Sequence, residues 1–285
     1  MMGEERIARV FPRRTAATPT DDLAFVGGPP LFTPEVDTVH ISVAFTWDLP
    51  AAERLAAEWS HVAPVSIGGP ATGAPGGEFV PGVYLKPGYV ITSRGCGNRC
   101  WFCSVWRREG QAVRELPIRD GWNVLDDNLL ACSEEHVRAV FAMLRSQPPR
   151  TAQFTGGLDA ARLERWHAEL MREVQIRSAY FAYDEPGDLE PLRDAGRLLR
   201  SVGFRHGDHD LRCYVLCGFP RDTIIDAEKR MRETLEAGFF PMAMAWRDVH
   251  GKRAPEWVRF QREWVNPWIV ATKAKVGAGM ARRTK

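Results

Sequence analysis

The chain of 285 residues is long enough for one principal domain with an appendage and short for two full enzyme domains. Hydrophobic residues make up 45% and charged residues 26%, which is typical of a folded protein and excludes disorder over most of the chain. Lys and Arg (38) nearly balance Asp and Glu (36), so the net charge of +2 indicates no global attraction to nucleic acids or membranes. No apolar run approaches the roughly 18 residues of a membrane span, and the N-terminus lacks a continuous apolar segment. We therefore expect a cytoplasmic protein with no membrane partner.

The first 85 residues have the pattern of a small α/β segment. Apolar, β-like runs occur at 7–11, 38–45 and 62–67. Between the last two, residues 49–59 have helical spacing with Pro50 near the start. The stretch 68–77, dense in Gly and Pro, marks a boundary. Residues 1–85 are therefore predicted to form a truncated Rossmann-like segment.

Residues 86–250 alternate between predicted strands and helices. Strands are expected at 89–92, 122–125, 152–155, 178–183, 213–216 and 241–246. Helices are expected after Ser133, which is a plausible N-cap, and at 162–174, 189–202 and 226–237, the last closed by Gly238. Six units whose apolar strands do not alternate indicate a parallel sheet buried on both faces. Six units are too few for an eight-fold barrel, so the predicted fold is α/β, a partial (β/α)6 TIM-like barrel with its site at the C-terminal strand ends.

Residues 251–285 break this rhythm. After Pro255, three aromatic residues recur at helical spacing, at Trp257, Phe260 and Trp264. We interpret this stretch as a C-terminal capping helix packed on the barrel. The residues that follow form a basic tail, which is typical of a frayed terminus.

The six cysteines direct the search for function to one short segment. Three of them, Cys96, Cys100 and Cys103, fall within eight positions. A disulfide framework would spread its cysteines along a shorter secreted chain, so this triplet indicates metal or cluster ligands. Zinc sites usually use four protein ligands in paired knuckles, and no second pair is present. Three thiolates from one loop suit a 4Fe-4S cluster whose fourth iron can bind a substrate or cofactor.

The segment around the triplet also carries a family resemblance. Gly95, Gly97 and Asn98 let a loop wrap closely around a cluster, and Phe102 can shield it. The C-x3-C-x2-C spacing after the first strand, with an aromatic residue before the third cysteine, resembles the radical S-adenosylmethionine (SAM) superfamily over about residues 88–250.

This resemblance implies a chemistry. Cys96, Cys100 and Cys103 would hold a 4Fe-4S cluster, and SAM would bind the open iron through its amine and carboxylate. Reductive cleavage of SAM would give a 5′-deoxyadenosyl radical that abstracts hydrogen. The resemblance also implies an external electron donor of the flavodoxin or ferredoxin type, and a substrate that is a small molecule or a nucleic acid.

The resemblance suggests SAM contacts at further strand ends. Asp126, Asp127 and Asn128 occupy the place of a short polar motif, usually Gly-Gly-Glu, that holds the methionine amine, and either acid can serve. Gly156 follows the third strand, where a tight turn is an equal alternative. Asp184 ends the fourth strand near the ribose position, with a helix N-cap role as competitor. Gly218 lies on the strand that would contact adenine.

The N-terminal segment bears a weaker resemblance to a truncated cobalamin-binding domain. It rests on residues 11–15, 28–31 and 67–70. The Asp-x-His-x-x-Gly ligand motif is absent, because His40 has the wrong spacing and its strand would direct it to a core or interface. We do not expect cobalamin binding.

Weaker candidates and two other functions stay open. The loop 206–210 could bind a metal or be a solvated turn, and Arg94 and Arg99 could balance cluster charge or be solvated. Cys213 and Cys217 are expected in the core. The leading interpretation is a radical SAM enzyme; the alternatives are a non-catalytic iron-sulfur or zinc protein, or an RNA-binding module that uses the basic, aromatic tail.

Overall fold

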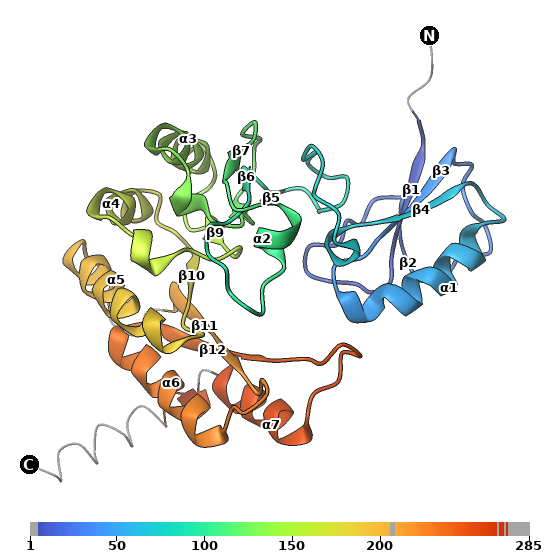
Figure 1. Cartoon of the computed structure of the whole chain (residues 1–285). Coiled ribbons are helices and arrows are strands. Elements are labelled where there is room, and N and C mark those ends of the chain that lie inside the picture. Colours follow the sequence, from blue (N-terminus) through green and yellow to red (C-terminus); the bar gives the residue numbers. More distant parts are fainter. Residues whose placement is uncertain (1–4, 206–208, 267, 271, 273–285) are drawn as a thin grey trace, which may run out of the picture. The chain divides into compact units, whose positions relative to one another are not determined.

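A computed structural model describes residues 5–205, 209–266, 268–270 and 272 (Figure 1). The chain divides into two compact units, residues 1–127 and 128–285. The domain boundaries near residues 85 and 250 remain sequence predictions. None of the described helices is both long and apolar enough to cross a membrane.

The first unit contains a four-stranded parallel sheet. Its strands are β1 (Ile7–Phe11), β2 (Ala24–Val26), β3 (Thr38–Ser42) and β4 (Val65–Gly68), in the order β2-β1-β3-β4. Three of these strands were predicted. The sequence analysis missed β2, because three partly exposed residues carry no readable alternation.

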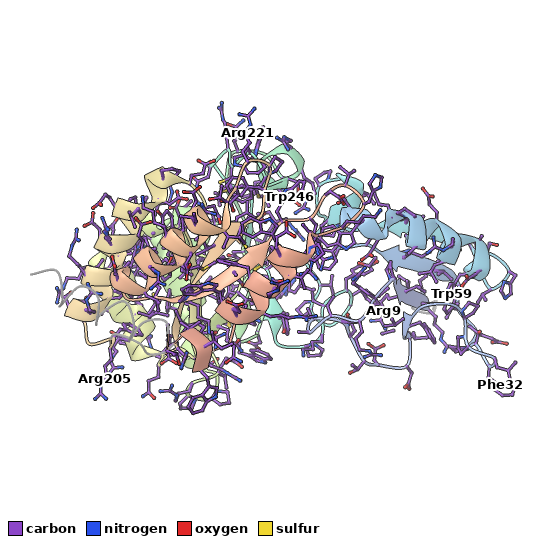
Figure 2. All side chains as sticks on the ribbon, turned by 90° about the horizontal axis from the view of Figure 1, so that it is seen from below. Arg9, Phe32, Trp59, Arg205, Arg221 and Trp246 are labelled. Atoms are coloured by element: carbon purple, nitrogen blue, oxygen red, sulfur yellow. The ribbon has the colours of Figure 1, made fainter. Side chains whose placement is uncertain are left out.

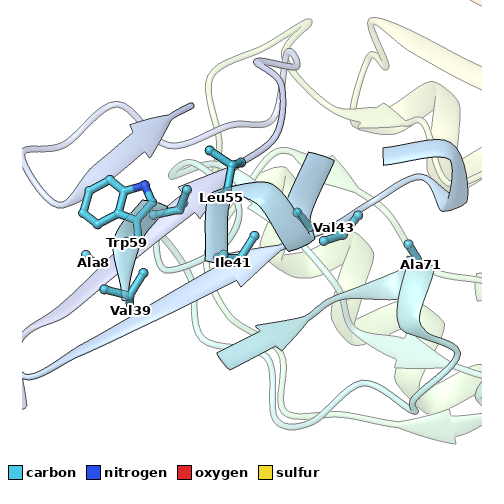
Figure 3. Close-up of a cluster of buried hydrophobic side chains, with 9 residues drawn as sticks. Ala8, Val39, Ile41, Val43, Leu55, Trp59 and Ala71 are labelled. Atoms are coloured by element: carbon cyan, nitrogen blue, oxygen red, sulfur yellow. The ribbon is translucent and has the colours of Figure 1, made fainter. Parts of the chain in front are cut away.

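Helix α1 (Leu49–Trp59) packs against β3 and β4 and closes the core of this sheet. Burial alternates along β3, where Val39 and Ile41 are inaccessible and their neighbours are half-buried. Trp59 is also fully buried and belongs to the same cluster of buried hydrophobic side chains as Val39 and Ile41, which Figure 3 shows. The predicted helix and its proline start are confirmed, because Pro50 lies in the first turn, where no backbone N–H is needed.

Contacts of Arg9 hold a later loop of the first unit against the sheet. Arg9 of β1, which is labelled in Figure 2, is 9% exposed. It forms an ion pair with Asp21 and donates hydrogen bonds to the carbonyl oxygens of Gly82 and Val83 at 3.2 and 3.0 Å. The loop that contains residues 82 and 83 is thereby anchored to the sheet.

The second half of this unit consists of very short elements. Strands β5 (Tyr89–Val90) and β8 (Asn123–Val124) pair in parallel, whereas β6 (Ser93–Arg94) and β7 (Arg114–Glu115) form an antiparallel pair. Helix α2 (Val105–Arg108) lies in the connection between β6 and β7. The hairpin and α2 were not predicted, since elements of two to four residues show no periodicity.

The second unit is built from parallel strands joined by helices. Adjacent in chain order are β9 (Gln153–Phe154), β10 (Ser178–Ala182), β11 (Leu211–Cys217) and β12 (Phe240–Ala245). The helices are α3 (Glu134–Arg145), α4 (Arg165–Glu173), α5 (Leu189–Ser201), α6 (Ile224–Ala237) and α7 (Pro255–Trp264). Neighbouring helices from α3 to α7 contact one another. Parallel strands need such crossover connections.

Local signals set the helix ends of this unit as predicted. The Ser133 hydroxyl accepts a hydrogen bond from the backbone of His136 and caps α3, and Gly238 closes α6 in the left-handed conformation at φ 104°. In α7, Trp257, Phe260 and Trp264 are all buried, and the helix packs against β12. The predicted capping helix is therefore present.

The predicted α/β class with parallel strands is confirmed, whereas the predicted arrangement of these strands as a partial barrel is not. The described residues form no barrel, so the partial (β/α)6 barrel remains a prediction. Burial on both sheet faces was also overestimated. In β11, residues Leu211, Cys213, Val215 and Cys217 are buried, while the residues between them are only half-buried. Strand β11 therefore alternates like a strand covered fully on one face.

Candidate functional site

The cysteine triplet lies in the connection between β6 and β7, within the first unit. Gly95 opens this loop at φ 96°, and a Cβ atom there would overlap the carbonyl oxygen of Ala112. The backbone N–H of Cys96 donates to Gly110 at 3.2 Å and closes the base of the loop. Only glycine fits at residue 95, as its position before the first cysteine suggested.

The loop is pinned at its centre as well. The indole N–H of Trp106 donates to the carbonyl oxygen of Cys100 at 3.1 Å, and the N–H of Cys103 donates to the same carbonyl oxygen at 3.1 Å. Phe102 is 36% exposed and packs edge-on against Trp101 at 5.4 Å. The aromatic pair therefore lies at the surface of the loop.

Exposure separates the triplet from the cysteines of β11. Cys96, Cys100 and Cys103 are half-buried, whereas Cys213 and Cys217 are fully buried, as predicted for core residues. Burial raises the pKa of the Cys103 thiol, and the charges of Cys96 and Asp127 act in the same direction. A bound cation would supply the positive charge that favours thiolates here.

The chemistry of the donor set fits an iron-sulfur cluster, because cysteine thiolates are the usual ligands of such clusters and this loop presents three half-buried cysteines. The coordinating geometry is not formed in advance. Among the described residues, no three His, Cys, Asp or Glu side chains gather in an arrangement that would hold a metal ion.

Glu109, just after α2, ties this loop to its surroundings. Its side chain is fully buried and accepts hydrogen bonds from Arg108 Nε at 2.9 Å, Arg114 Nη2 at 3.0 Å and the backbone of Gly76 at 3.0 Å. Arg94 Nη1 lies 3.5 Å from Glu109 Oε1. The sequence analysis missed Glu109. It follows Trp106, Arg107 and Arg108, and no sequence pattern distinguishes a buried glutamate in such a polar stretch from an exposed one.

The two candidate arginines therefore differ. Arg94 is 15% exposed at its side chain and belongs to the Glu109 group, whereas Arg99 is exposed and donates to Gln111 at 2.9 Å. The solvated role fits Arg99 and not Arg94.

Asp126 and Asp127 also have different environments. Asp126 is 2% exposed, and its two oxygens accept from Thr92 N at 2.5 Å, Thr92 Oγ1 at 2.6 Å and Ser93 Oγ at 2.8 Å. Asp127 is half-buried, and one of its oxygens accepts from Gly95 N at 2.9 Å. Burial raises the pKa of both carboxyl groups. Asp126 is committed to the fold, while Asp127 touches the start of the cysteine loop.

The other predicted SAM contacts belong to the second unit. Asn128 is buried, and its Nδ2 lies 3.4 Å from Asp159 Oδ2. Gly156 is exposed after β9, beside Gly157 at φ 102°, and the chain bends there.

Asp184 does not cap the following helix. Asp188 accepts from the backbones of Asp184 and Glu185 at 2.9 and 2.8 Å and is itself the residue before α5. Asp184 Oδ1 instead accepts from Leu216 N at 2.7 Å and links β10 to β11. Burial raises the pKa of Asp184 to about 7, and nearby Asp188 adds to this shift.

Gly218 has a clear packing role. It lies at φ 77° after β11, and a Cβ atom there would lie 2.7 Å from the indole ring of Trp257. Its N–H donates to Asp222 at 2.8 Å. A contact with adenine at Gly218 remains a prediction.

The loop 206–210 lies partly outside the described residues. His209 packs edge-on against Phe240 at 4.7 Å, and Asp210 forms an ion pair with Arg150 at 3.3 Å. These two side chains therefore have partners within the fold.

The structure thus brings Cys96, Cys100, Cys103 and Asp127 together around one loop of the first unit and places Asn128, Gly156, Asp184 and Gly218 in the second unit. In comparisons with known proteins, no family model and no curated protein matches the chain.

Proposed function

We propose that this protein is a radical SAM enzyme. The observation that carries the proposal is the loop between β6 and β7, which presents three half-buried cysteines at C-x3-C-x2-C spacing while the cysteines of β11 are core residues. A loop held at Gly95 and at Trp106, with its thiols left accessible, suits cluster binding better than a core role.

The chain's own residues have distinct roles in this proposal. Cys96, Cys100 and Cys103 hold the 4Fe-4S cluster, and Asp127 orients the loop through the N–H of Gly95. No hydrogen bond reaches the second carboxylate oxygen of Asp127 from the described residues, so it is available for the ammonium group of SAM. When bound, the cluster and SAM supply a radical that abstracts hydrogen from the substrate.

The proposed partners follow from the same chemistry. Reduction of the cluster requires an external donor of the flavodoxin or ferredoxin type, and the substrate is a small molecule or a nucleic acid. We do not propose cobalamin, because the Asp-x-His-x-x-Gly ligand motif is absent from the N-terminal segment.

The RNA-binding alternative loses most of its aromatic component, since Trp268 is the one aromatic residue of the described tail that is exposed, at 85%. Trp257, Phe260 and Trp264 are buried against the second unit, so in this fold they offer no stacking surface for bases. The basic residues from Lys273 onward lie outside the described residues.

Anaerobic reconstitution with iron and sulfide tests the proposal. We expect about four irons per chain, and loss of the cluster absorption in Cys96→Ala, Cys100→Ala and Cys103→Ala. Cys132→Ala is the matched control, since Cys132 is also half-buried but lies outside the loop. Stoichiometric zinc without sulfide would instead support a structural metal site.

A further inference from the structure

The first unit contains a cavity of about 560 Å³ at the carboxyl edge of its parallel sheet. Phe11, Ser42 and Gly68, the last residues of β1, β3 and β4, all line it. Strand β1 lies between β2 and β3. The chain therefore runs from β1 to β2 on one side of β1 and then crosses to β3 on the other side, so the strand order reverses at β1. Ligands of open α/β sheets bind at this switch point, and the cavity size is that of a small-molecule site.

Most of the cavity wall is apolar. Its large apolar side chains come from the strands and from the loops around them: Phe11, Ile41, Phe45, Ile67, Phe79 and Leu85. The hydroxyl groups of Ser42 and Ser66 add polarity on the sheet, and no hydrogen bond to either group is present among the described residues. Such a wall suits a ligand with an aromatic or aliphatic body.

One side of the cavity carries an excess of positive charge. Arg94, Arg108 and Glu109 line it, and Glu109 is the shared carboxylate of three arginines, the third being Arg114. Arg114 does not line the cavity, so two guanidinium groups face one carboxylate on this side and leave one positive charge in excess. The other cavity arginine, Arg13, is neutralised by a bidentate pair with Asp48. Glu78, the remaining acid of the wall, is 71% exposed and forms an ion pair with Arg119.

Arg94 is the least satisfied member of this group. Its contact with Glu109 is the longest, at 3.5 Å, and its buried Nε has no hydrogen-bond partner among the described residues. Gly76 makes room for it, because a Cβ atom at residue 76 would overlap the guanidinium group. A buried guanidinium with unused donors favours an anionic group.

We propose that this cavity binds a small molecule with an apolar body and one acidic group, and that Arg94, supported by Arg108, holds the acidic group. The site lies next to the segment that precedes Cys96, but its binding does not depend on a cluster. The proposal therefore stands or falls separately from the proposed enzymatic function.

Two fluorescent probes of the same shape test the proposal on the full-length protein. The anionic probe is 8-anilino-1-naphthalenesulfonate, and the neutral probe is N-phenyl-1-naphthylamine, which lacks only the sulfonate. We expect saturable binding of the anionic probe at one site per chain. Arg94→Gln should weaken it by about 10-fold or more and leave the neutral probe within about two-fold, since a charge-assisted contact is worth about 1.5 to 3 kcal/mol.

Matched variants separate this outcome from a disturbed fold. Arg114→Gln removes one of the cations paired with Glu109. Because Arg114 does not line the cavity, the affinity for the anionic probe should change by less than about two-fold. Gly76→Ala keeps all charges and displaces the Arg94 guanidinium, so it should weaken the anionic probe alone. Ser66→Phe fills the cavity from β4 and should abolish binding of both probes.

Three results would overturn the proposal: no saturable binding of the anionic probe, binding that survives Ser66→Phe, or equal loss of affinity in Arg94→Gln and Arg114→Gln. Circular dichroism confirms that each variant is folded. If Arg94→Gln fails to fold, Arg94→Lys and Gly76→Ala decide the question.

Discussion

Removal of the Glu109 charge should destabilise the first unit by more than any exposed acid can. Its carboxylate is fully buried, and the Arg94 and Arg108 side chains around it are 15% and 10% exposed. Glu109→Gln leaves these two cations without a countercharge, while the loss of the half-exposed Arg114 contact matters little. Since one-sided removal of a buried pair costs about 3 to 5 kcal/mol and glutamine retains one acceptor, we expect a loss of about 2 to 4 kcal/mol.

Urea unfolding measures this loss. With a slope of about 1 to 3 kcal/mol per molar urea, the midpoint of the affected transition should fall by about 1 M or more. Because two compact units can unfold in separate steps, hydrogen exchange of peptides covering residues 93–115 assigns the transition to the first unit. Glu78→Gln is the matched control, because Glu78 is 71% exposed and lies 3.6 Å from exposed Arg119. Equal midpoints for the two variants would refute the role of Glu109.

Three further predictions concern the strand ends. Gly218→Ala should lower the melting temperature of the second unit, because residue 218 has a positive φ and faces Trp257, whereas Gly187→Ala, with open space around it, should not; similar melting curves would contradict this. The raised pKa of Asp184, about 7 against 3.8, means that the folded state binds the extra proton between these values, so the stability of the second unit should fall as the pH rises from about 4 to 7. Asp184→Asn should flatten this dependence in urea titrations at several pH values, and an unchanged slope would show that Asp184 is not its source. Asp127→Asn should weaken SAM binding, measured by calorimetry, by about 10-fold and leave the melting temperature unchanged. Asp126→Asn should instead lower the melting temperature, because Asp126 accepts buried hydrogen bonds. The reverse pattern would exchange the roles of the two residues.

Sequence patterns predicted the elements that show hydrophobic periodicity or that begin and end at capping residues. Ser133 and Gly238 mark helix ends through their own backbone preferences, and the aromatic spacing after Pro255 is that of a buried helix face. Strands with apolar runs were found in the right places, although β5, β8 and β9 are only two residues long. These signals arise from neighbouring residues, so they can be recognised in a single sequence.

Features that depend on tertiary contacts could not be predicted in this way. The β6–β7 hairpin has two residues in each strand, and the burial of Glu109 depends on three arginines and a glycine from four different positions. Asp184 was interpreted as a possible cap because it precedes a helix, yet the parallel strand β11 supplies its partner. The cysteine spacing predicted the loop that matters, but the cavity in the same unit left no motif in the sequence.

The most direct test of the central claim is the product formed from SAM. The reconstituted protein, mixed anaerobically with dithionite and SAM, should release 5′-deoxyadenosine, since the cofactor supplies the difficult step and the chain positions it. Cys100→Ala should form none, while Cys132→Ala should match the unmodified protein. Absence of 5′-deoxyadenosine from protein that holds a complete cluster, or equal amounts with Cys100→Ala, would contradict the account.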